Sequence, residues 1–233
     1  MKLNAFPARL DPLYKRMIEQ VCNLDNANLC KRILAIVTVV YRSITLKNLT
    51  FFVEMTEIAS NDLESLAEII ELCGSFLTLQ ECTICFVHQS AKEFLLEKAS
   101  EEVFLSGTGD VHYSIFSRSL EVMSRTLHRD MYGLCAPGFS IDKVERPDPD
   151  PLAAIDYSCV YWVDHLCDWD SSKGAKHRND IQDEGVVDKF LRQKYLYWLE
   201  ALSLRRSMSE GVFSMDKLDG LLPVSLKSVM PFY

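Results

Sequence analysis

Three side chains that could do chemistry lie close together, at Cys82, Cys85 and His88. Their spacing, Cys-x-x-Cys-x-x-His, resembles half of a zinc site. A structural zinc ion needs four ligands, and the sequence has no second pair at short spacing. Alternation along a strand would also send Cys82 and His88 to one face and Cys85 to the other. We therefore predict no metal site at these residues.

Catalysis by one of these thiols would need a partner base. A cysteine nucleophile requires a histidine close in space, and the chain has five histidines but no nucleophile motif such as G-x-S-x-G. Paired carboxylates such as Glu101–Glu102 fall in charged contexts that a solvated surface explains better than glycosidase chemistry. We predict a non-catalytic protein. The alternative is a thiol hydrolase using Cys82 or Cys85, whose sign would be one unusually reactive cysteine.

Phosphate-binding loops are missing from the sequence. No G-x-x-x-x-G-K-[ST] occurs, and Gly107-x-Gly109 lacks the strand and the third glycine of a dinucleotide-binding turn. We therefore expect the chain by itself to bind no nucleotide and no other cofactor.

The elements that position His88 are predicted from residues 75–96. Two short apolar strands flank a polar turn at Gln80–Glu81, and the second strand ends at His88. A helix follows, with Ser90 and Glu93 at capping-box spacing. Earlier in the chain, apolar periodicity predicts helices over 29–40, from Thr45 as cap, and from Asn61 or Asp62 to Gly74. Three helices followed by a β-wing is the order of a winged helix.

Beyond Gly107–Asp110 the pattern is helical throughout. Apolar residues at 3.6-residue spacing predict one helix over 111–127 and two aromatic-rich helices near 155–169 and 187–202. An acidic, proline-rich loop covers 140–151. The predicted fold is therefore mainly α, a winged-helix domain with a small β-wing followed by an α-helical array. The predicted divisions are an entry segment (1–28), the winged helix (29–105), a helical domain (106–222) and a divergent tail (223–233).

Composition limits the partners. The 233 residues carry a formal net charge of -8, which argues against charge-driven binding to nucleic acid or to an anionic membrane. The helix before the wing, 61–71, has four acidic residues and no basic one, which disfavours the alternative of a DNA-binding winged helix.

The apolar run 33–41 is too short to span a membrane. Eight cysteines without a visible secretion signal predict reduced thiols and a cytoplasmic location.

Several strings, taken together, also carry a family resemblance. They are Leu10-Asp-Pro-Leu-Tyr14, Cys73-Gly-Ser-Phe-Leu77, Phe86-Val-His-Gln-Ser-Ala-Lys-Glu-Phe-Leu95, Arg129-Asp-Met-Tyr132 with Ala136-Pro-Gly138, Asp150-Pro-Leu152, Tyr157-Ser-Cys-Val-Tyr-Trp-Val-Asp-His-Leu166 and Lys194-Tyr-Leu-Tyr-Trp-Leu-Glu-Ala-Leu202. Over residues 8–222 the chain resembles the region after the NACHT module of fungal STAND proteins, the NLR-like receptors linked to heterokaryon incompatibility. The strings at 88–92 and 161–166 are the most specific in combination.

The resemblance implies a winged-helix domain and a helical domain between a NACHT ATPase core and a C-terminal sensor of WD or ankyrin repeats. Residues 1–28 would then end the helical region associated with NACHT. In that family the histidine at the strand-to-helix junction contacts the nucleotide diphosphate and helps to hold the closed, inactive state. His88 matches that position, so ADP or ATP would be contacted only with a NACHT core in place.

The resemblance also implies the partners, which are the NACHT domain and the repeat sensor, in cis or in trans. The sequence departs from the family in lacking the NACHT core and in diverging after Leu222. We therefore expect a fragment that serves as a regulatory and interaction module, coupling nucleotide state to a sensor. Exposed docking faces would favour self-association.

Overall fold

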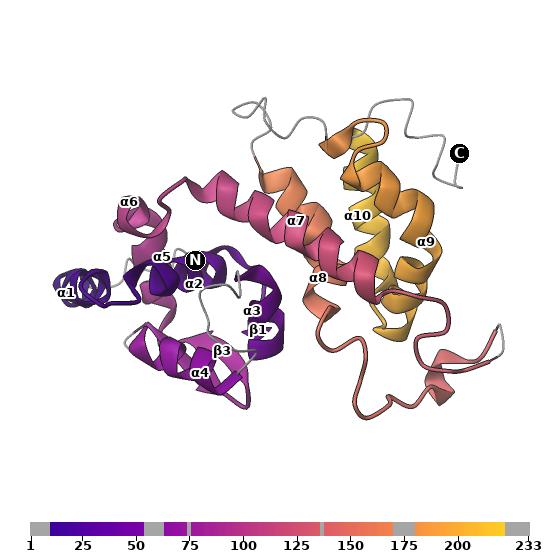
Figure 1. The fold of residues 1–233 in the computed structure, drawn as a ribbon, viewed down its shortest axis with the longest axis horizontal. Coiled ribbons are helices and arrows are strands. Elements are labelled where there is room, and N and C mark those ends of the chain that lie inside the picture. Colours follow the sequence, from indigo (N-terminus) through magenta and orange to yellow (C-terminus); the bar gives the residue numbers. More distant parts are fainter. Residues whose placement is uncertain (1–9, 54–62, 74–75, 136–137, 170–179, 222–233) are drawn as a thin grey trace, which may run out of the picture. The chain divides into compact units, whose positions relative to one another are not determined.

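The computed structural model describes residues 10–53, 63–73, 76–135, 138–169 and 180–221. The chain divides into two compact units, Met1–Val111 and His112–Tyr233 (Figure 1). Each unit has its own apolar core and is treated separately below. Among the described residues, no helix has both the length and the apolar character needed to cross a membrane.

The first unit has the element order of a winged helix. Its elements are α1 (Asp11–Cys22), α2 (Ala27–Val39), β1 (Ile44–Thr45), α3 (Leu46–Phe52), α4 (Leu63–Leu72), β2 (Leu77–Gln80), β3 (Thr83–Phe86), α5 (Gln89–Glu97) and α6 (Ser100–Val103). The predicted order of three helices followed by a β-wing is confirmed by α2, α3, α4 and the β2–β3 hairpin. The expected helix ends at Asn61 or Asp62 and at Gly74 lie outside the described residues.

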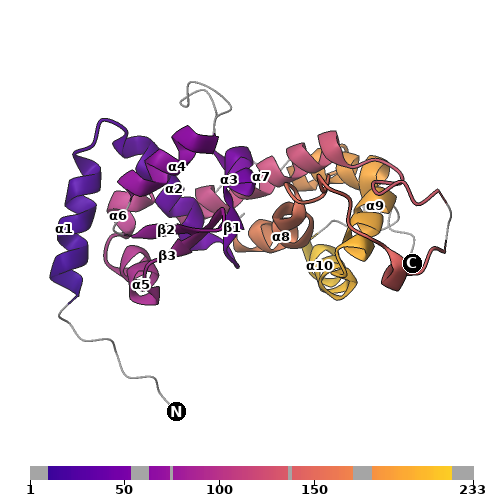
Figure 2. The same cartoon turned by 90° about the horizontal axis from the view of Figure 1, so that it is seen from below.

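The first unit contains a three-stranded antiparallel sheet with the strand order β1-β3-β2 (Figure 2). Strand β1, which the sequence analysis did not predict, pairs Ile44 with Ile84 of β3, and both side chains are fully buried. A strand of two residues is too short for a period-2 pattern to reveal it. The central position of β3 therefore comes from a tertiary contact between segments forty residues apart.

The hairpin turn lies one residue later than predicted. Gln80 still pairs with Thr83, so the turn residues are Glu81 and Cys82 and not Gln80 and Glu81. Both turn residues have positive φ, 48° and 67°. Two consecutive left-handed residues match the right-handed twist of the flanking strands, although asparagine and glycine are the usual residues there. The polar character of Gln80 suggested a turn, but backbone pairing keeps this residue in the strand.

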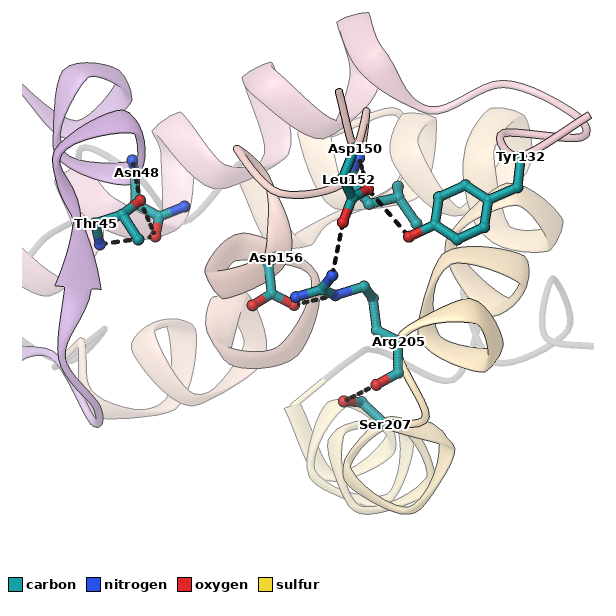
Figure 3. A network of polar contacts seen from close by, with 8 residues as sticks. All are labelled: Thr45, Asn48, Tyr132, Asp150, Leu152, Asp156, Arg205 and Ser207. Atoms are coloured by element: carbon teal, nitrogen blue, oxygen red, sulfur yellow. Dashed lines mark hydrogen bonds and ion pairs between the residues drawn. The ribbon is translucent and has the colours of Figure 1, made fainter. Parts of the chain in front are cut away.

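Helix α3 begins where the sequence predicted it. Thr45 is the N-cap, and its Oγ1 accepts from the Asn48 amide nitrogen at 3.2 Å while Asn48 Oδ1 accepts from the Thr45 amide nitrogen at 3.1 Å. Figure 3 draws these reciprocal bonds. Such a box satisfies amide groups that would otherwise have no partner in the first helical turn.

The second unit is an array of helices. It contains most of α7 (Thr108–Thr126), the 3-10 turn η2 (Ile141–Lys143), α8 (Asp156–Asp168), α9 (Val186–Leu204) and α10 (Met208–Leu221). The three helices predicted here are confirmed. Helix α10 was not predicted, because its buried face is formed by Gly211, Ser214 and Leu218 and produces little apolar periodicity.

Aromatic side chains fill the centre of this unit. The ring of Trp162 on α8 contacts Trp198 on α9 edge-on, with centroids 5.7 Å apart, and lies 5.5 Å from the Phe190 ring. Trp198 donates its indole hydrogen to the Cys159 carbonyl oxygen at 2.8 Å. Both tryptophans are fully buried, so they pack the helices together and offer no exposed platform for a ligand.

Candidate functional site

His88 occupies the junction between β3 and α5 and caps the helix itself. Its backbone is extended (φ -151°, ψ 144°), and α5 begins at the next residue, Gln89. The Ser90 amide donates to His88 Nδ1 at 3.2 Å. The predicted capping box starting at Ser90 is therefore wrong, because Ser90 is the second residue of the helix and His88 supplies the cap.

A chain of hydrogen bonds holds the His88 ring from the core side. Ser90 Oγ lies 2.7 Å from His88 Nδ1, and the Tyr14 hydroxyl lies 2.8 Å from Ser90 Oγ. Tyr14 comes from α1, is 6% exposed, and packs between the rings of Phe76 and Phe94. The ring orientation of His88 is thus set by a buried tyrosine seventy-four residues earlier in the chain. Sequence reasoning missed this link, because no local pattern connects α1 with the wing.

The cap determines the chemistry available at the other ring nitrogen. In a neutral imidazole one nitrogen accepts and the other carries the hydrogen. Since Nδ1 accepts from the Ser90 amide, the neutral ring has its hydrogen on Nε2. His88 is an exposed residue, so this arrangement suits Nε2–H for donation to an anionic oxygen brought to the surface.

The two neighbouring cysteines do not join His88 in a site. Cys82 lies in the hairpin turn and is exposed, so the strand alternation assumed for it does not apply. Cys85 Sγ lies 3.9 Å from Ser43 Oγ. Within the described ranges, no group of three or more histidine, cysteine, aspartate or glutamate side chains could hold a metal ion. The thiol-hydrolase alternative gains no support, since neither thiol is hydrogen-bonded to an imidazole in the described part of the chain.

Helix α4 occupies the place of a DNA-recognition helix. Its exposed side chains include Glu64, Glu68 and Glu71, and the helix carries no lysine or arginine between Leu63 and Leu72. Phosphate oxygens would be repelled by this face. The electrostatics therefore disfavour the DNA-binding alternative.

A second polar cluster organises the loop before α8 (Figure 3). At the C-terminal end of α9, Arg205 donates from Nε to Asp156 at 2.6 Å and from Nη1 to Asp150 at 2.9 Å. Asp150 also accepts from the Tyr132 hydroxyl at 3.0 Å and from the Leu152 amide at 2.9 Å. The Arg205 side chain is only 13% exposed. These contacts tie the loop to α9.

A buried pair of histidines links α7 with α8 in the second unit. His112 Nδ1 lies 2.9 Å from His165 Nδ1, and His165 Nε2 lies 2.7 Å from the Tyr157 hydroxyl. Burial, assisted by the neighbouring His112, lowers the pKa of His165 to about 2. Burial also lowers the pKa of His112, while Asp168 opposes that shift. The sequence analysis assigned no role to either histidine, and the eight-residue spacing of Tyr157 and His165 was the available sign that they share a helix face.

Comparison with known proteins agrees with this architecture. Residues 16–105 match the family described as "GPI inositol-deacylase, winged helix domain". The chain is 53% identical to the vegetative incompatibility protein HET-E-1 of Podospora anserina over an alignment that covers 95% of this chain. The chain spans 17% of the length of that protein. No solved structure matches it.

Proposed function

Because this chain belongs to the winged-helix and helical region of fungal NACHT-type incompatibility proteins, we propose that it is a non-catalytic regulatory module of an NLR-like signalling ATPase. Its winged helix would dock on a NACHT nucleotide-binding domain, in cis or in trans. Its helical domain would couple the nucleotide state to a C-terminal repeat sensor. We therefore expect the surface that docks on the NACHT domain to lie within 29–105, and the residues that couple the nucleotide state to the sensor to lie within 106–222.

The observation that carries this proposal is the hydrogen bonding of His88. Its Nδ1 accepts from the Ser90 amide, which leaves the hydrogen of the neutral ring on Nε2. In the docked state Nε2–H would donate to an oxygen of the ADP diphosphate. A charge-assisted hydrogen bond of this kind is stronger than one between neutral groups. Bound ADP would therefore strengthen the docking and favour the inactive state.

The proposal is tested by pull-down of the tagged chain with a separately expressed NACHT core, with and without ADP. His88→Asn is the informative variant, because an asparagine side chain caps a helix well but cannot reproduce the distal imidazole nitrogen. We expect the wild type to bind more tightly with ADP and His88→Asn to lose that increment. His88→Ala should lose the increment together with about 1 kcal/mol of stability from the lost cap.

The matched control is His128→Asn, which replaces an exposed histidine in the second unit. This variant should keep the full response to ADP. Binding of the wild type that ignores ADP, or an ADP response that survives in folded His88→Asn, would contradict the proposed contact. Hydrolysis of ATP by the isolated chain would contradict the non-catalytic role.

A further inference from the structure

A small polar pocket opens beside the first turn of α5 in the first unit. It has a volume of about 260 Å³. Its walls come from the end of α2, the loop before β1, strand β3 and α5. The polar side chains among its lining residues are those of Tyr41, Arg42, Ser43, Cys85, Gln89 and Lys92.

The charge of this pocket is unusual for so acidic a chain. Arg42 and Lys92 line it, and none of its lining residues is an aspartate or glutamate. The pocket beside α1 instead has two acidic and two basic residues, including the ion-paired Asp11 and Lys98. A larger pocket in the second unit has two carboxylates and a single arginine. With a net charge of -8 for the whole chain, the cationic lining is a local property.

Lys92 is the more buried of the two cations that line this pocket. Its ammonium group is partly buried and donates to the Val40 carbonyl oxygen, at the end of α2, over 3.2 Å. Across the described residues it forms no ion pair with a carboxylate. An ammonium group has three N–H donors, so this bond uses one of them. Burial lowers the pKa of Lys92, and an anion beside it would offset that cost of desolvation.

Neutral donors surround the two cations. Ser43 contributes a hydroxyl group and Gln89 a side-chain amide. Gln89 is also the first residue of α5, whose amino end carries a partial positive charge, and the first turn of this helix contains no acidic residue. Cations and neutral donors around one small cavity form a suitable environment for an oxyanion.

We propose that this pocket binds a phosphate group, with Lys92 and Arg42 as its cationic partners. The site needs only this chain, so it does not depend on docking to a NACHT core or on the contact proposed for His88. The phosphate group could come from free inorganic phosphate, or from the terminal phosphate of a nucleotide, which would run against the expectation that the chain by itself binds no nucleotide. These two sources share the same chemistry and are separated by the experiment.

The test is a titration of the ¹⁵N-labelled full chain with inorganic phosphate at pH 7.5 and constant ionic strength, followed by amide NMR shifts. We expect saturable shifts concentrated at Ser43, Gln89 and Lys92. A weak single-group contact of this kind corresponds to a dissociation constant of about 1 mM. Lys92→Gln should weaken binding about tenfold, as expected for loss of a charge-assisted contact.

Lys98→Gln is the matched control, because it removes a lysine from the neighbouring, charge-balanced pocket of the same unit. Arg42→Gln gives an independent test should Lys92→Gln disturb the fold through its lost bond to α2. Pyrophosphate and ADP identify the source. Equal affinities for inorganic phosphate, pyrophosphate and ADP support a free oxyanion as the ligand. Tighter binding of ADP than of inorganic phosphate supports a nucleotide phosphate. Absence of saturable shifts, or equal phosphate affinity in the wild type and in both folded pocket variants, would overturn the proposal.

Discussion

The buried histidine pair should make the stability of this protein depend on pH through His165. The residue is 0% exposed, and burial lowers its pKa to about 2 from an ordinary value of 6.5. In the unfolded chain the imidazole is hydrated and takes up a proton as the pH falls below 6.5. In the folded chain it stays neutral. The unfolded state therefore binds more protons in this range, and acid favours unfolding.

The size of the effect follows from the difference between the two pKa values. The contribution of neutral His165 to the free energy of unfolding is fully present above pH 6.5, and it is lost progressively as the pH falls towards 2. A pH of 5.0 lies about 1.5 units below the pKa of a histidine in the unfolded chain. At about 1.36 kcal/mol per unit, His165 alone lowers the free energy of unfolding by about 2 kcal/mol at this pH. His112 acts in the same direction, since burial lowers its pKa too, although Asp168 reduces that shift.

The assay compares urea unfolding at pH 7.5 and pH 5.0 for the wild type and for His165→Gln. Glutamine keeps a donor and an acceptor for His112 and Tyr157 but does not titrate. Whatever its stability at pH 7.5, the variant should lose about 2 kcal/mol less than the wild type between the two pH values. His128→Gln, at an exposed position, should lose as much as the wild type. Equal losses in the wild type and His165→Gln would refute the reasoning.

Three further perturbations test the packing of the molecule. Arg205→Leu leaves two carboxylates without their cation at a site where the arginine is 13% exposed, so urea unfolding should show a loss of about 3 kcal/mol. Gly211→Ala would bring a methyl group within 2.5 Å of Leu202 Cδ1, and Leu202 is fully buried. We therefore expect the free energy of unfolding to fall by about 1–2 kcal/mol, despite the better helix propensity of alanine. Exposed Cys82 should react with a thiol-reactive disulfide reagent in the native protein. Burial raises the pKa of Cys159, so this thiol should react only on unfolding. Mass spectrometry of the labelled chain would show both results.

The order of the larger elements could be predicted because their patterns are local. Apolar residues at helical spacing predicted α2, and Thr45 as a capping residue predicted the start of α3. The aromatic stripes predicted α8 and α9. In each case the hydrophobic face and the capping residue belong to the segment that they specify, so no distant contact had to be known.

The features that were missed depend on contacts between distant segments. Strand β1 has two residues and exists because Ile44 pairs with Ile84. Helix α10 buries a glycine against Leu202 of α9, so close packing replaces the apolar stripe that would have marked it. The hairpin turn was misplaced by one residue because the pairing of Gln80 with Thr83 outweighs the polarity of Gln80.

The candidate site shows the same division. The sequence by itself determined that a short strand is followed by a helix at His88, because a period-2 apolar segment changes there to a helical one. The strand itself ends at Phe86 and not, as predicted, at His88. Only the tertiary structure decided that His88 caps the helix and that Tyr14, through Ser90, orients its ring. Likewise, folding alone brings Arg42 and Lys92 to one pocket. Backbone periodicity is encoded within a few residues, whereas hydrogen-bond direction and local charge are set by whichever segments the folded chain brings together.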